Sequence, residues 1–130
     1  MLSYGVLNNG NLCGTNMSVG NGRQLVVYED SAGACPFQDW FDSLKPDAAA
    51  KVTTALVRLA RGLGDLEPVG SGVTELRIHW QAGYRVYMGF DGLEIVILLC
   101  GGTKRRQKAD IERAKRLWAD YRARKQRAGL

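Results

Sequence analysis

The chain has 130 residues, of which 45% are hydrophobic and 24% are charged, and its formal net charge is +5. This length supplies one hydrophobic core and not two, and the longest uninterrupted apolar run, Ile95 to Cys100, is far shorter than the roughly 20 residues that cross a bilayer. The start of the chain also lacks the basic residue and the apolar stretch of a secretory signal, so we expect a cytoplasmic protein without a membrane segment.

Residues 1–22 contain five Asn and five Gly and show no hydrophobic periodicity. This composition predicts a flexible leader ahead of one domain that spans residues 23–130. We expect the first strand of that domain at Leu25 to Tyr28.

Two helices are expected next. Pro36 stands where a helix accepts proline, and the apolar residues that follow it at helical spacing predict a short helix that ends before Pro46. A second helix is expected from Asp47 to about Arg61, with Gly62 as its stop. One face of this second helix is apolar, and another carries Lys51, Thr54 and Arg58.

The stretch from Thr74 to Lys104 predicts a three-stranded antiparallel meander, preceded by a loop at Gly64 to Gly72. A three-residue hairpin loop at Gln81 to Gly83 gives the first two strands a definite register. Alternation then places one face in apolar pairs, namely Trp80 with Tyr84, Ile78 with Val86 and Leu76 with Met88. The opposite face receives Arg77 opposite Tyr87 and His79 opposite Arg85.

The second turn of the meander is expected at Asp91 and Gly92. The last strand, Leu93 to Leu99, is apolar on both faces apart from Glu94, so it should be central and covered on both sides. A helix is expected from Gln107 to about Arg124. Residues 103–130 hold eleven Lys or Arg against three acidic residues, so this helix is a basic arm. Such an arm can track phosphates, but it can equally be a solvated face or a site for an acidic partner.

One face of the meander gathers the candidate functional side chains, which are Arg77, His79, Arg85 and Lys104. Gly101 and Gly102 precede the lysine and would let a ligand approach the backbone closely. Each residue also has a plain structural explanation. Arg77 and Arg85 can be surface cross-strand residues, with Arg77 stacked on Tyr87 and paired with Glu75. His79 can be a polar surface residue, and Lys104 can cap its strand or decorate a turn.

Other kinds of chemistry find no support in the sequence. Three cysteines at wide spacing, a single His and no CxxC pair suggest neither a disulfide framework nor a zinc site, and CGGTK is not a phosphate-binding P-loop. We therefore expect no metal and no cofactor. A site of Arg, Lys, His and Tyr suits cleavage of RNA by its own 2′-hydroxyl, because a base, stabilising cations and an acid are enough for that reaction.

The residues ELRIHWQAGYRVYMGF, followed by an apolar strand and CGGTK, resemble the RelE/ParE superfamily of bacterial toxins, specifically its HigB-like or phage Gp49-like "addiction module killer" branch. The resemblance extends from about Leu25 to Tyr121. It implies an α+β protein with a RelE-like fold, in which an N-terminal strand and a helical hairpin precede an antiparallel β-meander and a basic C-terminal helix.

The resemblance also implies roles for particular residues. Arg85 falls on the phosphate-stabilising arginine, Lys104 falls on or beside a second catalytic basic position, and Arg77 lies near basic residues of the preceding strand. A helix tyrosine used by some members would fall near Asp110, which cannot replace it. Either Tyr84, Tyr87 or His79 takes over its role, or the activity is weaker or different. RNA contacts are expected from Tyr84, Tyr87, Arg105, Arg106 and Lys108.

The function that this resemblance implies is that of a type II toxin, a metal-independent endoribonuclease that cleaves mRNA on the ribosome and inhibits translation. Its expected partners are mRNA, the ribosome and a cognate antitoxin of the helix-turn-helix, HigA-like kind. Two alternatives stay open. One is a ParE-like gyrase poison, and the other is a nucleic-acid-binding module without catalysis, whose affinity would fall with salt while the RNA stayed intact.

Overall fold

The computed structural model describes residues 16–17 and 22–129. The expected leader, residues 1–22, lies largely outside these ranges. The elements follow in the order β1 (Asn16–Met17), β2 (Gln24–Val27), α1 (Pro36–Asp42), α2 (Pro46–Ala60), β3 (Asp65–Gly70), β4 (Val73–Ile78), β5 (Tyr84–Asp91), β6 (Ile95–Thr103), the 3-10 turn η2 (Lys104–Arg106) and α3 (Gln107–Arg127).

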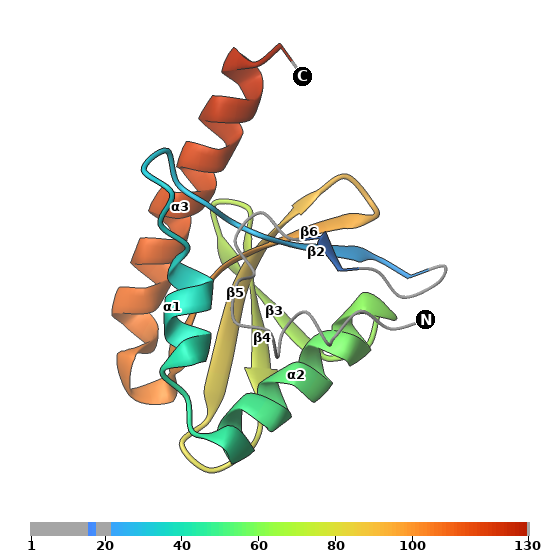
Figure 1. Ribbon diagram of the computed structural model, residues 1–130, viewed down its shortest axis with the longest axis vertical. Coiled ribbons are helices and arrows are strands. Elements are labelled where there is room, and N and C mark those ends of the chain that lie inside the picture. The colour runs from blue at the N-terminus through green and yellow to red at the C-terminus, as the bar shows by residue number, and fades with distance from the viewer. Residues whose placement is uncertain (1–15, 18–21, 130) are drawn as a thin grey trace.

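The strands form one sheet in the order β1-β2-β6-β5-β4-β3, in which β2 and β6 are parallel and all other neighbours are antiparallel. The helical hairpin of α1 and α2 packs on one face and α3 on the other, and the C-terminal end of α3 extends beyond the sheet (Figure 1). The α+β class and the C-terminal helix are therefore confirmed. None of the helices in residues 22–129 combines the length and the hydrophobicity that crossing a bilayer requires.

Strand β6 lies at the centre of the sheet and is buried on both faces, as its composition predicts. Val96 and Leu98 join the core beneath the helical hairpin, and Ile97 and Leu99 join the core beneath α3. The strand begins at Ile95 and continues to Thr103, so the predicted bounds were displaced toward the N-terminus. Leu93 is 92% exposed because it belongs to the turn before the strand.

The predicted loop at Gly64 to Gly72 is wrong, because most of it forms strand β3. This strand lies at the edge of the sheet, where Pro68 is tolerated because its lack of a backbone N–H breaks no hydrogen bond to a neighbouring strand. An irregularity in register falls between Pro68 and Gly70. The meander consequently has four strands, from β3 to β6.

The register predicted for the first hairpin is also wrong. Ile78 lies opposite Tyr84 and Leu76 opposite Val86, so Arg77 lies opposite Arg85 and not opposite Tyr87. Five residues, 79–83, connect the strands instead of three. The shift equals two residues, so the side chains within β4 and β5 keep the faces that alternation assigned to them. His79 and Trp80, which were expected to pair with Arg85 and Tyr84, lie in the connection instead.

The two glycines at the end of β6 serve internal packing. A side chain at Gly101 would overlap the ring of Trp40, and one at Gly102 would overlap the carboxylate of Asp110. The expectation that these glycines admit a ligand is thus corrected, since α1 and α3 already occupy the space over the two faces of the strand. Both helices sit close to the backbone that leads into Lys104.

The cysteines differ from one another. Cys35 is disulfide-bonded, which corrects the expectation, drawn from the wide spacing of the cysteines, that they form no disulfide framework. Cys100 is free and buried beneath α3, and burial raises the pKa of its thiol to about 12. Cys100 therefore stays protonated at neutral pH and is not a nucleophile.

The contact between Gly101 and Trp40 predicts the effect of a single methyl group. Gly101→Ala should lower the free energy of unfolding by about 1–3 kcal/mol, because the methyl group displaces the indole ring. Urea denaturation measures the change. Trp40→Leu should relieve the overlap, so that the double variant loses less than the sum of the two single losses. Strict additivity would show that the ring does not press on this glycine.

Candidate active site

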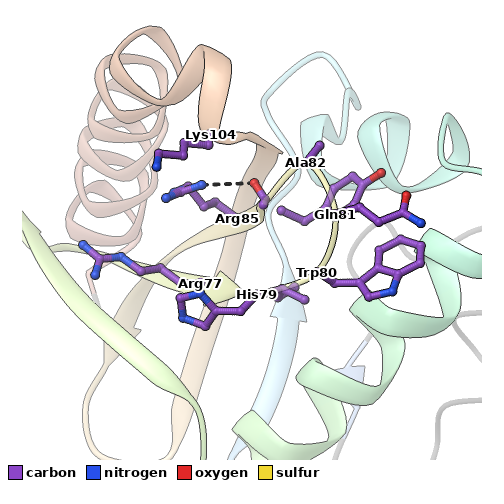
Figure 2. Close-up of a pocket in the computed structure, with 10 residues that line it drawn as sticks. Arg77, His79, Trp80, Gln81, Ala82, Arg85 and Lys104 are labelled. Atoms are coloured by element: carbon purple, nitrogen blue, oxygen red, sulfur yellow. Dashed lines mark hydrogen bonds between the residues drawn. The ribbon is translucent and has the colours of Figure 1, made fainter.

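An open pocket of about 590 Å³ lies at the end of the hairpin between β4 and β5 (Figure 2). All four side chains singled out in the sequence line it, namely Arg77, His79, Arg85 and Lys104. The other lining residues are Ile78, Trp80, Gln81, Ala82, Gly83 and Tyr84. None of the lining residues is acidic, so the pocket concentrates positive charge and suits an anionic ligand.

The sheet brings these cations together from three strands. Arg77 of β4 and Arg85 of β5 are direct cross-strand neighbours, and Arg85 lies opposite Gly102 of β6, two residues before Lys104. The carbonyl oxygen of Gly83 accepts hydrogen bonds from the backbone N–H of Lys104 at 2.9 Å and from Nη1 of Arg85 at 3.0 Å. That shared acceptor ties the hairpin loop to the end of β6.

A buried carboxylate holds the two arginines. Glu75 is 0% exposed, and its Oε1 accepts a hydrogen bond from Nε of Arg77 at 2.9 Å. Its Oε2 accepts a hydrogen bond from Nε2 of Gln107 at 2.8 Å and lies 3.4 Å from Nε of Arg85. The hydrogen bond to Glu75 is the main cause that raises the pKa of Arg77. Glu75 thus joins β4, β5 and α3 beneath the pocket.

These contacts leave particular N–H groups for a ligand. Arg77 also donates from Nη2 to the exposed Glu67 at 3.2 Å, and Arg85 is only 9% exposed. Within residues 22–129, Nη1 of Arg77 and Nη2 of Arg85 have no hydrogen-bond partner. In Figure 2 the charged ends of Arg77, Arg85 and Lys104 point to the same side. The arginines therefore present fixed donors to one volume.

His79 pairs with an acidic residue that the sequence did not bring to notice. Its Nε2 lies 2.5 Å from Oδ2 of Asp65 in β3, and the imidazole is 74% exposed. The sequence did not predict Asp65 as a site residue, because residues 64–72 were expected to form a loop and not a strand beside His79. The sequence also did not predict that Gln107 belongs to the site. No local pattern shows that the first residue of a helix will contact a strand residue 32 positions earlier.

The two candidate tyrosines, Tyr84 and Tyr87, lie in different environments. Tyr84 lines the pocket and stacks on Trp80, with ring centroids 5.9 Å apart. Tyr87 is 0% exposed beneath α3, so it cannot contact RNA in this structure, and we remove it from the site. Burial, followed by the charge of Glu75, raises the pKa of its hydroxyl. Alternation places Tyr87 on the correct face, but that face is covered by α3 at this position.

The basic residues after Lys104 are exposed at the start of α3. Arg105, Arg106 and Lys108 make no ion pair with any other described residue. Farther along the helix, Arg124 pairs with Asp120 and Lys125 pairs with Asp91. The unpaired positive charge beside the pocket thus comes from η2 and the first turn of α3.

Asp110 lies on the inner side of the same helix. It is 6% exposed, packs against Gly102, and within residues 22–129 its Oδ2 has no hydrogen-bond partner. Burial raises the pKa of this carboxyl, whereas the charges of Arg106 and Arg113 lower it. A buried carboxylate without a partner destabilises the fold when it is ionised.

Metal ligands do not gather in the described part of the chain. No group of three His, Cys, Asp or Glu side chains in residues 22–129 is close enough to hold an ion. In the pocket itself, His79 is the one side chain of these types. Metal-independent chemistry remains a prediction that rests on this set of side chains.

Comparison with known proteins places the chain among phage-related sequences. The family described as "Phage derived protein Gp49-like (DUF891)" matches residues 39–119, a range that includes all four pocket residues named above. A Haemophilus influenzae protein, described only as uncharacterized, is 45% identical over 83 residues, which cover 62% of this chain and 84% of that protein.

The buried carboxylate predicts unequal effects of two similar substitutions. Glu75→Gln keeps the size of the side chain but removes the charge that compensates Arg77 and Arg85, so the free energy of unfolding should fall by about 2–3 kcal/mol. Glu67→Gln is the matched control, because Glu67 lies opposite Glu75 in β3 and pairs with Arg77 at the surface. It should cost less than about 1 kcal/mol. Equal losses in urea denaturation would contradict this assignment.

The burial of Asp110 predicts a dependence of stability on pH. Its pKa is raised above the roughly 3.9 of an unfolded chain, so the folded state binds the proton more tightly and the free energy of unfolding falls as the pH rises through this window. Asp110→Asn removes the titrating carboxyl, so the free energy of unfolding of this variant does not fall with pH for this reason. The variant should be more stable than the wild type by about 1 kcal/mol at pH 7 and lose that advantage near pH 3. A variant that is less stable at pH 7 would refute this prediction.

Proposed function

Because the chain belongs to the Gp49-like family of phage-derived proteins, a family commonly associated with toxins of toxin–antitoxin systems, we propose that it is a type II toxin of the RelE/ParE superfamily, on its HigB-like branch. We propose further that it adopts a RelE-like fold and cleaves mRNA on the ribosome without a metal. The observation that carries the proposal is the pocket in which Arg77, His79, Arg85 and Lys104 meet without an acidic lining residue.

The proposed reaction is a transesterification within the RNA. The 2′-oxygen attacks the adjacent phosphorus and forms a 2′-O–P bond, while the bond from phosphorus to the 5′-oxygen of the next nucleotide breaks. A base removes the 2′-hydroxyl proton and an acid returns a proton to the leaving 5′-oxygen. The products are a 2′,3′-cyclic phosphate and a free 5′-hydroxyl, and no water, metal or redox partner is consumed.

The geometry supports a division of roles. Nη2 of Arg85 and the ammonium group of Lys104 bind the phosphate and stabilise the charge that grows on it in the transition state. Nη1 of Arg77 binds a neighbouring oxygen. His79, oriented by Asp65, exchanges a proton with the reacting oxygens. Tyr84, Arg105, Arg106 and Lys108 contact the rest of the RNA, and the protein acts in the cytoplasm, where ribosomes carry mRNA.

The proposed partner that restrains this activity is a cognate antitoxin of the HigA-like, helix-turn-helix kind, which presents an acidic segment to the pocket. The support comes from charge, since residues 103–130 hold eleven Lys or Arg against three acidic residues. Strand β6 offers the antitoxin no apolar surface, because both of its faces are buried within the protein.

Lys104 gives the cleanest test of the reaction, because it is exposed, whereas Arg85 is buried and its loss would also disturb Glu75. Lys104→Ala should slow cleavage of mRNA on purified ribosomes by about a hundredfold with little change in stability. Lys45→Ala, which removes another exposed positive charge that lies outside the pocket, should have no effect. The rate of appearance of new RNA 5′-ends is measured.

The same assay separates the alternatives. The proposal requires 5′-hydroxyl ends and cleavage that persists on magnesium-stabilised ribosomes when transition metals are chelated. Intact RNA together with inhibited DNA gyrase would favour a gyrase poison. Intact RNA with salt-sensitive binding would favour a module that binds nucleic acid without cleaving it.

A further inference from the structure

A second hollow adjoins the pocket on the side of α2. It has a volume of about 630 Å³ and shares Arg77, Ile78 and His79 with the pocket. Its other lining residues are Lys51, Thr54, Ala55 and Arg58 of α2, Gly64, Asp65 of β3 and Leu76 of β4. We call this hollow the α2 groove.

The helical periodicity of α2 explains why several of its polar side chains line one side of the groove. Lys51, Thr54 and Arg58 are three and four positions apart, so they form one stripe along the helix. The residues that α2 buries, such as Val52 and Leu56, project toward the sheet instead. The stripe is exposed and makes no contribution to the proposed cleavage reaction.

The charges around the α2 groove favour an anion. Lys51, Arg58, Arg77 and His79 line it, and its one acidic residue, Asp65, is engaged by His79. Lys51 also lies 5.8 Å from the ring centroid of Trp80. Trp80 lines the pocket, and its side chain points away from the charged ends of Arg77, Arg85 and Lys104 (Figure 2). The cations of α2 thus continue the positive surface of the pocket.

We propose that the α2 groove binds the backbone of single-stranded RNA next to the phosphate held in the pocket, an inference that rests on the proposed function. A strand whose phosphate lies between Arg85 and Lys104 must leave the pocket, and the α2 groove is continuous with it through Arg77 and His79. Lys51 and Arg58 pair with phosphates of the flanking nucleotides.

An acidic amphipathic peptide fits this groove less well. Such a peptide needs apolar surface to bury, but Leu76 and Ile78 are 1% and 9% exposed and already belong to the core. Ala55 adds only a small side chain. The groove therefore exposes few apolar side chains for such a peptide to bury, whereas its exposed Lys51 and Arg58 match the phosphates of a nucleic-acid backbone.

The test measures the affinity of the full-length protein for RNA whose 2′-hydroxyls are all methylated, because this RNA cannot cleave itself and so stays intact. Oligonucleotides of about three and about nine nucleotides are compared over a range of salt concentrations, beginning at low salt. The groove variant combines Lys51→Gln with Arg58→Gln. The matched control combines Lys45→Gln with Arg61→Gln, which removes two exposed charges from the same helical region outside both hollows.

We expect the groove variant to reduce the salt slope for the long oligonucleotide by about 1.4, as two lost phosphate contacts to a single strand require, and to leave the short oligonucleotide unaffected. The control should leave both slopes unchanged. Thermal unfolding of each variant verifies that the fold is intact.

Two results would overturn the inference while leaving the proposed function in place. The first result is that binding of the short oligonucleotide depends on Lys104, whereas the affinity and the salt slope for the long oligonucleotide are the same in the wild type and in the groove variant. The other is a groove variant that weakens binding only of a polyglutamate peptide, which would assign the groove to an acidic protein segment. If neither oligonucleotide binds wild-type protein at low salt, the proposed function fails and the inference fails with it.

Discussion

The carboxylate of Glu75 lies out of reach of solvent between the sheet and α3, and its ionic environment governs the arrangement of the candidate site. Two arginines from adjacent strands and the amide of Gln107 share its two oxygens. A buried carboxylate costs several kcal/mol unless it is paired in this way. The arginines therefore hold fixed orientations before any ligand arrives. Within residues 22–129, Nη1 of Arg77 and Nη2 of Arg85 have no hydrogen-bond partner, so these groups are the ones left for a ligand.

This arrangement has a functional consequence. A flexible arginine loses side-chain entropy when it binds phosphate, whereas one that is already held by a carboxylate loses less. Glu75 also reduces the charge of the pair, so two arginines can lie side by side without a bound anion. Lys104 and the residues that follow it add the more mobile, exposed charges. The pocket thus combines preorganised and adaptable cations around one volume.

The sequence predicted which face of the sheet each strand side chain occupies better than it predicted which of those side chains are buried. Alternation placed Arg77 and Arg85 on one face, and that assignment survived a register error because the true pairing differs by two residues. His79, predicted to pair with Arg85, lies in the connection after β4. Strand β3 was missed because Gly and Pro usually break strands, although an edge position tolerates both. The burial of Tyr87 and Glu75 was not predictable, because it depends on where α3, whose first residue is 32 positions after Glu75, packs across the sheet.

Our central proposal is that the Glu75-anchored arginines and Lys104 hold the phosphate at which RNA is cut. A crystal structure of the protein with an oligonucleotide that lacks the attacking 2′-hydroxyl tests it most directly. We predict phosphate oxygens about 3 Å from Nη2 of Arg85 and from Nζ of Lys104, with both arginines still paired with Glu75. An oligonucleotide bound only along α3, with the pocket empty, would contradict it.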